Sequence, residues 1–134
     1  MISKRHYGFN LIELLIAITV VGIVATIAFP SYQNSVRKGN RTDGHKALLE
    51  ALSGMEQYFY SENTYTTDLT KLGYSSTTNV TTEQGHYTLS VASPTKHCPI
   101  TSCVTLQAKA IHNQMPDGDL TIDTRGQKLP LDKW

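Results

Sequence analysis

An uninterrupted apolar run near the start of the chain constrains its fold more than any other feature. From Leu14 to Phe29 the sequence has no charged residue, and only threonine and glycine interrupt the aliphatic side chains. The stretch 9–29 would form about 31 Å of α-helix, which matches the hydrocarbon thickness of a bilayer. One acidic residue, Glu13, lies at the front of this stretch. We therefore expect a membrane-crossing helix that contains a carboxylate in need of a partner.

Three interpretations of this region are open. A cleaved secretory signal could use the basic segment SKRHY, but Glu13 lies inside its apolar part and ATIAFP is a poor cleavage site. A simple membrane anchor is the second, with Lys4 and Arg5 placing the N-terminus in the cytoplasm. The third is cleavage between Gly8 and Phe9, which gives Phe9 a free amine about one helical turn before Glu13. Among parallel helices, the amine of one subunit would pair with Glu13 of its neighbour and set the axial register.

The remainder of the chain is polar and fits one modest domain. The 134 residues have a formal net charge of +1, with 12 Lys and Arg against 11 Asp and Glu, so no global field would gather nucleic acid. Helical periodicity resumes after Pro30 and ends near Ser61 or Glu62, although Gly39 and Gly44 bracket a weaker stretch. An apolar stripe runs along this second half, formed by Leu48, Leu52, Met55 and Phe59.

Three alternating runs, 86–93, 104–110 and 119–124, predict β-strands, and the threonine-rich segment 63–85 predicts a partly ordered loop. The fold class is therefore α+β. A long N-terminal α-helix, apolar in its first half and amphipathic in its second, packs on a small antiparallel β-sheet.

Two cysteines, Cys98 and Cys103, lie in the segment CPITSC. An even count beyond a membrane segment favours an oxidising compartment and one disulfide. A ring this short would contribute only about 2 kcal/mol, so it would fix a turn more than hold the fold. A zinc site is the alternative, because His97 adjoins Cys98, but the spacing matches no second pair of ligands.

Nothing in the sequence is spaced for catalysis, because it has no G-x-S-x-G elbow, no phosphate-cradling glycine loop and no H-E-x-x-H. We expect no catalytic residue, cofactor or metal site. Three acids, Asp117, Asp119 and Asp123, lie close together, but they lack the ligand pattern of an EF-hand and fit a turn. The cations that could contact DNA are scattered among acids, with Trp134 as the sole tryptophan. They are Lys96, Lys109, Arg125, Lys128 and Lys133.

The segment GFNLIELLIAITVVGIVATIAFPSYQ resembles the class III leader and N-terminal helix of type IV pilins and the related pseudopilins. In this resemblance Gly8 ends the leader, Phe9 is the first mature residue and Glu13 is the fifth. The resemblance implies cleavage after Gly8 and N-methylation of Phe9 by a prepilin peptidase. It also implies that Phe9 and Glu13 guide assembly. Gly22 and Pro30 occupy the family's helix-weakening positions, which implies that the helix melts between them in the filament.

The second half resembles the type IVa branch, particularly its minor pilins, in NRT-acid-G, YFYSEN-TY-T and L-T-I-D-x-x-G. The implied division is a leader at 1–8, a transmembrane and filament-core helix at 9–30, and a periplasmic or extracellular α+β domain at 31–134. Relatives commonly use a disulfide to clamp the C-terminal strand or tail. Here both cysteines lie in one short turn, so the tail GQKLPLDKW lacks that clamp.

The implied function is a structural subunit of a type IV pilus, with roles in adhesion, twitching motility or DNA uptake. The subunit would reside in the inner membrane, with its N-terminus in the cytoplasm, and then in the extracellular pilus. The implied partners are other pilin subunits, the prepilin peptidase, and an inner-membrane assembly platform with its ATPase. Two alternatives stay open: a pseudopilin of a type II secretion system and a DNA-binding competence pilin.

Overall fold

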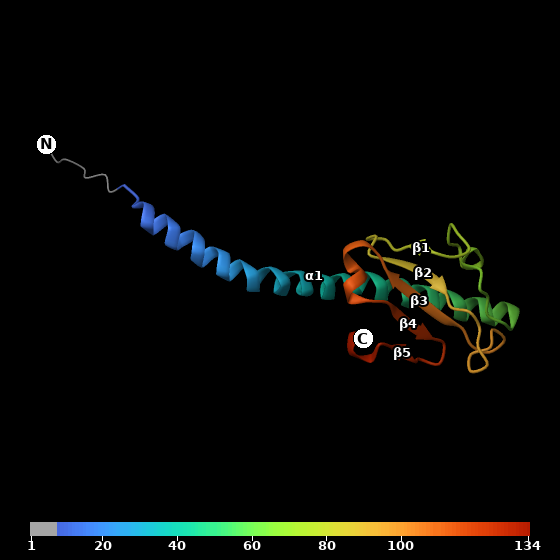
Figure 1. The fold of residues 1–134 in the computed structure, drawn as a ribbon. Coiled ribbons are helices and arrows are strands. Elements are labelled where there is room, and N and C mark those ends of the chain that lie inside the picture. The colour runs from blue at the N-terminus through green and yellow to red at the C-terminus, as the bar shows by residue number, and fades with distance from the viewer. Residues whose placement is uncertain (1–7) are drawn as a thin grey trace. The chain divides into compact units, whose positions relative to one another are not determined.

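The computed structural model describes residues 8–134, so residues 1–7, which include Lys4, Arg5 and most of the predicted leader, lie outside the described part. The chain divides into two compact units, of which the first ends at Val36 and the second is Arg37–Trp134. Helix α1, Leu11–Glu62, belongs to both units and is drawn in blue to green in Figure 1. Its end at Glu62 confirms the predicted C-terminus, whereas its start lies two residues after Phe9.

The first unit consists of the apolar part of α1. This helix is long and apolar enough to cross a membrane, and the side chains of its apolar window are exposed in the isolated chain. The backbone stays helical through Gly22 and Pro30. The helix is equally continuous from Gly39 to Gly44, where the sequence indicated a weaker stretch.

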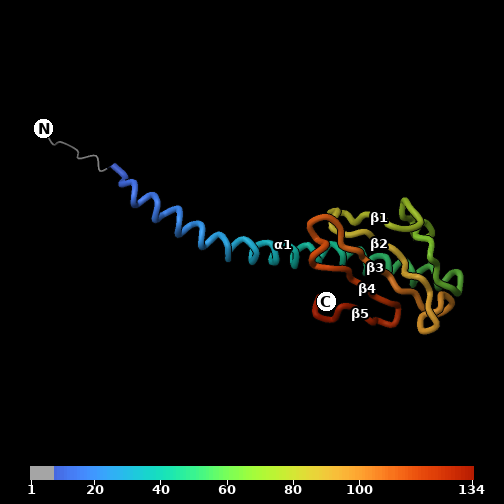
Figure 2. Tube along the Cα trace, viewed as in Figure 1, coloured from blue at the N-terminus to red at the C-terminus, as the bar shows by residue number. Residues whose placement is uncertain are grey.

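The second unit contains a five-stranded antiparallel sheet in the order β1-β2-β3-β4-β5, which follows the chain across the sheet in Figure 2. The three predicted runs form the central strands. The edge strands were not predicted, because two residues are too few to show an alternation. The strands are β1 Val80–Thr81, β2 Tyr87–Val91, β3 Thr105–Ala110, β4 Leu120–Asp123 and β5 Lys128–Leu129.

The core lies between the second half of α1 and one face of the sheet (Figure 1). Leu48 and Met55 of the predicted stripe are fully buried, together with Ala51, while Leu52 and Phe59 pack at the margin of the core. The sheet contributes alternate side chains, as its register requires. These are Tyr87, Leu89, Leu106, Ala108, Leu120 and Ile122.

Gly44 is a buried position of α1 that lies directly against the sheet. A Cβ at this position would lie 3.0 Å from Leu120 Cδ1 and 3.1 Å from the ring of Tyr87. The glycine that looked like a weak point of the helix is therefore a packing residue.

Three short 3₁₀ helices connect these elements: η1 Leu69–Leu72, η2 His112–Asp117 and η3 Leu131–Lys133. Leu69 is fully buried and anchors the threonine-rich loop to the core. Cys98 and Cys103 form the predicted disulfide. The amide of Tyr65 donates to the carbonyl of Ile100 inside that ring, at 3.0 Å, so the disulfide turn also supports the loop that follows α1.

Candidate functional site

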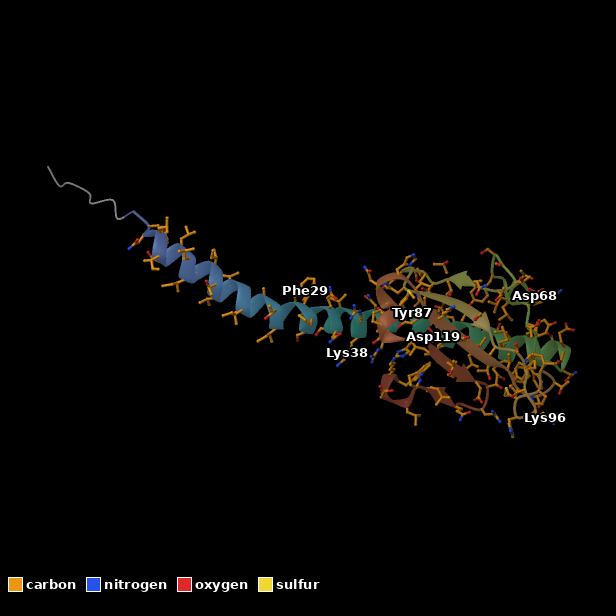
Figure 3. The ribbon with its side chains drawn as sticks, viewed as in Figure 1. Phe29, Lys38, Asp68, Tyr87, Lys96 and Asp119 are labelled. Carbon is orange, nitrogen blue, oxygen red and sulfur yellow. A yellow bond between two sulfur atoms is a disulfide. The ribbon has the colours of Figure 1, made fainter. Side chains whose placement is uncertain are left out.

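The apolar part of α1 displays aliphatic side chains around its whole circumference (Figure 3). Its hydroxyl groups are already satisfied, because Thr19 Oγ1 donates to the Leu15 carbonyl and Thr26 Oγ1 to the Ile23 carbonyl, both at 2.7 Å. Such internal bonds let a threonine enter an apolar environment without an unpaired polar group. This part of the helix is therefore suited to burial in lipid or among other helices.

Glu13 is different. It lies in the first turn of α1, and within residues 8–134 its carboxylate has no hydrogen bond or ion pair. Phe9, which precedes the helix, is exposed. A carboxylate in an apolar environment costs several kcal/mol unless a partner compensates it, so burial of this helix requires a cation from elsewhere.

A second candidate site lies in the second unit, at the C-terminal end of the chain. We call it the Trp134 cluster and define it as Arg41, His45, Lys128, Lys133 and Trp134. The ring of Trp134 stacks on His45 of α1, with centroids 4.4 Å apart and planes 24° apart. Lys128 Nζ of β5 lies 4.8 Å from the centroid of the Trp134 ring, which is cation–π geometry.

Two hydrogen bonds to backbone carbonyls, one of them in η2, complete the attachment of the C-terminal tail. Trp134 Nε1 donates to the carbonyl of Leu129 at 3.3 Å, and Lys133 Nζ donates to the carbonyl of Asp117. The tail that lacks a disulfide clamp is therefore fastened by an aromatic stack and by hydrogen bonds.

Arg41 joins the cluster to η2 through a bidentate ion pair. Its Nε and Nη2 each lie 2.6 Å from a carboxylate oxygen of Asp117. Hydrogen bonding to Arg41 is the largest cause that lowers the pKa of Asp117, against the opposing effect of burial. Both side chains are mostly buried, so this pair fixes η2 on the helix.

The environment of His45 favours its neutral form. Burial is the largest cause that lowers the pKa of His45, and the positive charges of Arg41 and Lys128 lower it further, while the Lys133 backbone and Asp117 oppose this. His45 Nε2 is buried and has no hydrogen-bond partner among the residues of the described chain. Protonation of His45 would place a third positive charge near those of Arg41 and Lys128.

A buried polar network adjoins the ion pair of Arg41 and Asp117. The amide nitrogen of Gln114 lies 2.9 Å from Tyr87 Oη, 3.0 Å from Asp117 Oδ2 and 2.9 Å from the carbonyl of Arg37. Burial raises the pKa of Tyr87 to about 12, so its hydroxyl stays neutral. The network therefore holds η2 against α1 from Arg37 onward.

The five cations that could contact DNA are arranged differently in the structure from their scatter in the sequence. The structure brings Lys128 and Lys133 together at Trp134. Arg125 lies at the disulfide turn instead, where Nη1 donates to the His97 carbonyl at 2.8 Å and Nη2 pairs with Asp123 at 2.7 Å.

Lys109 and Lys96 lie apart from that grouping. Lys109 is exposed on β3, and Lys96 is exposed in the turn that precedes Cys98. The sequence analysis missed Arg41 and His45, because they lie on α1, more than 80 residues before Lys128. Their helical spacing of four residues was the only available signal.

The sequence offered two alternatives to the expectation of no metal site, one at the cysteines and one at the three acids, and in the structure the side chains of both are engaged in other bonds. The sulfurs of Cys98 and Cys103 are joined, so they cannot serve as thiolate ligands for zinc, although the Asp123 carboxylate lies within 4.8 Å of them. Asp117 is engaged by Arg41, and Asp119 accepts bonds from the Ala110 amide at 2.9 Å and from Gln107 at 3.2 Å. Asp123 accepts from the Gln127 amide at 2.8 Å. These acids stabilise turns.

Comparison with known families gives two matches. The profile described as "Type IV minor pilin ComP, DNA uptake sequence receptor" matches residues 30–121. The profile of the prokaryotic N-terminal methylation motif matches residues 3–29. Together they cover the apolar helix and most of the second unit.

Individual relatives agree with these profiles. A fimbrial protein of Neisseria meningitidis serogroup A is 27% identical over 95% of this chain and 70% of its own length. The type IV wide pilus major component PilA4 of Thermus thermophilus is 34% identical over 72% of this chain and 73% of its own. The fimbrial protein EcpC of Eikenella corrodens is 30% identical over 59% of this chain, and the match spans 52% of EcpC, about half its length.

Among solved structures, a type IV pilin from Shewanella oneidensis matches with a TM-score of 0.50 and 22% identity. The match covers 71% of this chain and 92% of that pilin. At this identity the likeness establishes the fold, a long helix packed on an antiparallel sheet.

Proposed function

The chain belongs to the ComP family of type IV minor pilins, and on this premise we propose that it is a structural subunit of a type IV pilus, polymerised through its N-terminal helix. The observation that supports this role best is the apolar part of α1. Its one charged residue is Glu13, which has no partner among the described residues. Such a helix suits storage in the inner membrane and later burial among the helices of other pilins in an extracellular fibre.

The proposed processing divides the chain into a leader at 1–8, a filament-core helix at 9–30 and an outward-facing domain at 31–134. A prepilin peptidase cuts after Gly8 and methylates Phe9, and a membrane platform with its ATPase adds the subunit to the fibre. The match to the methylation motif supports this sequence of events. The role requires no catalytic residue and no cofactor.

Pairing between the Phe9 amine and Glu13 of a neighbour is the step that sets register. We expect Glu13→Ala to reduce incorporation into sheared fibres strongly, while the protein still inserts into the membrane. Glu62→Ala is the matched control, because Glu62 is an exposed acid in the last turn of the same helix. Mass spectrometry of fibres and of membranes measures both pools.

Three outcomes would revise this proposal. Normal fibre levels of Glu13→Ala would remove the register role of Glu13. A processed protein that is absent from wild-type fibres would point to a pseudopilin of a type II secretion system. An uncut chain that begins at Met1 would be a plain membrane anchor.

DNA uptake is a second candidate function, supported by the Trp134 cluster and by the description of the matching family. Trp134 is partly buried against the core, and cations that gather around a partly accessible aromatic ring are a common surface for phosphates and bases. Lys128 and Lys133 would contact phosphate oxygens, and they lie on the same side of the domain as Trp134.

The test is titration of the full-length protein in detergent with a random-sequence duplex at several salt concentrations. We expect Lys128→Gln to weaken binding and to reduce the slope of log K against log salt by about 0.9, the change for one lost phosphate contact. Lys71→Gln in η1, an exposed lysine remote in sequence, serves as the control. Binding that is unaffected by Lys128→Gln, or no binding at low salt, would exclude this role for the cluster.

A further inference from the structure

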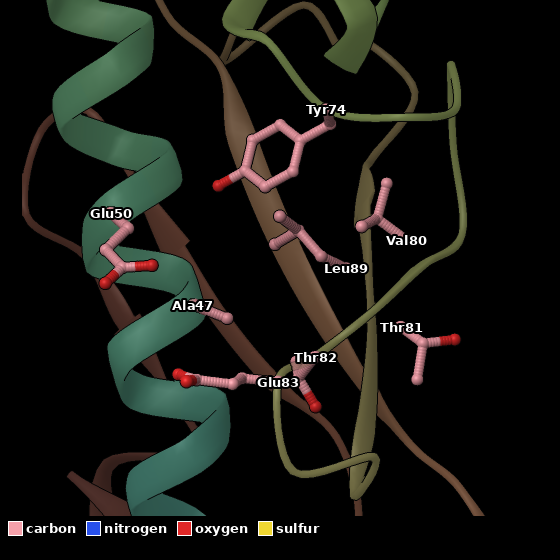
Figure 4. A pocket seen from close by; sticks show the side chains of 8 residues that line it. All are labelled: Ala47, Glu50, Tyr74, Val80, Thr81, Thr82, Glu83 and Leu89. Atoms are coloured by element: carbon pink, nitrogen blue, oxygen red, sulfur yellow. The ribbon is translucent and has the colours of Figure 1, made fainter.

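A pocket lies beside strand β1, on the sheet edge opposite β5. It has a volume of about 220 Å³ and opens between α1, the segment after η1, and strands β1 and β2 (Figure 4). Ala47, Tyr74, Val80 and Leu89 give it an apolar lining, and two acids, Glu50 and Glu83, also line it. We call it the β1-edge pocket.

The two acids of this pocket already attract a cation. Lys46 Nζ lies 2.5 Å from Glu83 Oε2 and 4.0 Å from Glu50 Oε1. The side chains of all three residues are more than half exposed, with relative exposures of 57%, 62% and 74% for Lys46, Glu50 and Glu83. Ion pairs this exposed to solvent stabilise a protein little, so Lys46 can leave readily. With one ammonium for two carboxylates, the rim keeps one negative charge.

The size of the pocket restricts its occupant. Sites for drug-sized ligands start at roughly 300 Å³, so this pocket is too small for such a molecule and suits a single side chain. An apolar lining below two carboxylates matches lysine, which buries its methylene stem and leaves its ammonium at the surface. A second ammonium would also neutralise the rim.

We propose that the β1-edge pocket receives a lysine side chain of the adjacent pilin subunit in the fibre, a contact that rests on the proposed function. The charge distribution of the domain supports this occupant. The acidic pocket lies at the β1 edge, whereas Lys128 and Lys133 lie on β5 and η3, at the opposite edge. Contacts between unlike edges are heterologous, and such contacts build an open helical filament when the rotation between subunits does not close a ring.

Zero-length carbodiimide coupling of intact sheared fibres tests this contact, because it joins a carboxylate to an amine only when they touch. The Lys46→Gln variant removes the internal competitor. In its fibres we expect a covalent two-chain species whose linked peptides join Glu50 or Glu83 to a lysine of another pilin chain. The species should be lost when Glu50→Gln and Glu83→Gln are added, and should persist with Glu62→Gln as the matched control.

The outcomes separate this proposal from the one on which it rests. If the Lys46→Gln protein is present in fibres but Glu50 and Glu83 form no bond to another chain, the pocket does not bind a neighbour, and the role as a fibre subunit stands. If the wild-type protein is absent from fibres, both proposals fall.

Discussion

At the scale of single residues, His45 makes the stability of the second unit depend on pH. Its imidazole stacks on Trp134 and lies near the positive charges of Arg41 and Lys128. Burial and these charges favour the neutral form in the folded protein, which lowers the pKa of His45 below its ordinary value of 6.5. The stabilisation is therefore complete above pH 6.5 and is lost as the pH falls from 6.5 through the lowered pKa.

We expect the free energy of unfolding to decrease on acidification below pH 6.5, and His45→Phe to flatten this part of the profile. Phenylalanine keeps a ring against Trp134 but cannot titrate. The measurement is chemical denaturation at several pH values, followed by the fluorescence of Trp134, which is the sole tryptophan. His112→Phe, at an exposed position, should leave the slope unchanged. A wild-type profile that is flat below pH 6.5 would contradict the assignment.

A pair of glycines on α1 offers a second prediction at this scale. Alanine at Gly39 meets nothing within 4 Å, so Gly39→Ala should stabilise the helix by about 1 kcal/mol. Alanine at Gly44 would press on Leu120 and Tyr87, both fully buried, and overpacking costs about 1–3 kcal/mol. We therefore expect Gly44→Ala to be clearly less stable than Gly39→Ala in thermal unfolding. Equal stability of the two variants would show that the helix can move away from the sheet.

At the scale of secondary-structure elements, the hydrophobic periodicity of the sequence predicted the buried stripe of α1 and the three central strands. The stripe of Leu48 and Met55 follows helical spacing, and the central strands alternate over four to six residues. The Trp134 cluster could not be predicted, because stacking of α1 on the tail is a tertiary contact between distant segments. The bidentate pair of Arg41 and Asp117 is of the same kind. Neither leaves a local pattern in the sequence.

The disulfide turn and the C-terminal tail should respond independently to mutation. Replacing Cys98 and Cys103 by serine removes a short ring, which should cost about 2 kcal/mol of unfolding free energy. The tail is attached by His45 and Lys128 instead, so the emission spectrum of Trp134 in the folded variant should match that of the wild type. Trp134→Ala is the converse variant, because it keeps the disulfide and removes the ring that Lys128 contacts. A changed Trp134 spectrum in the serine variant would show that the two segments are coupled.

At the scale of the whole molecule, α1 runs through both units, from the segment proposed to polymerise into the domain proposed to face outward. In the isolated chain it is helical from Leu11 to Glu62, including Pro30, which cannot donate a helical hydrogen bond. From Arg37 onward η2 holds the helix, since Arg37 Nε donates to the Asn113 carbonyl at 3.1 Å. The stretch that is predicted to melt, 22–30, lies before this contact.

We expect the stretch between Gly22 and Pro30 to lose helicity in the assembled fibre. Hydrogen–deuterium exchange should then be faster for residues 22–30 in fibres than in detergent-solubilised subunits, while protection from Arg37 onward is unchanged. Combining Gly22→Ala with Pro30→Ala should slow the exchange in fibres, and Gly39→Ala should not. Equal protection of 22–30 in both states would contradict melting.

The attachment of the tail also affects the order of events during biogenesis. A clamp made of a stacked ring, a cation and backbone acceptors needs no oxidant. The contacts that hold the C-terminal segment can therefore form before or after the cysteines are oxidised. Attachment of the tail to the second unit is in this respect independent of the oxidation of Cys98 and Cys103.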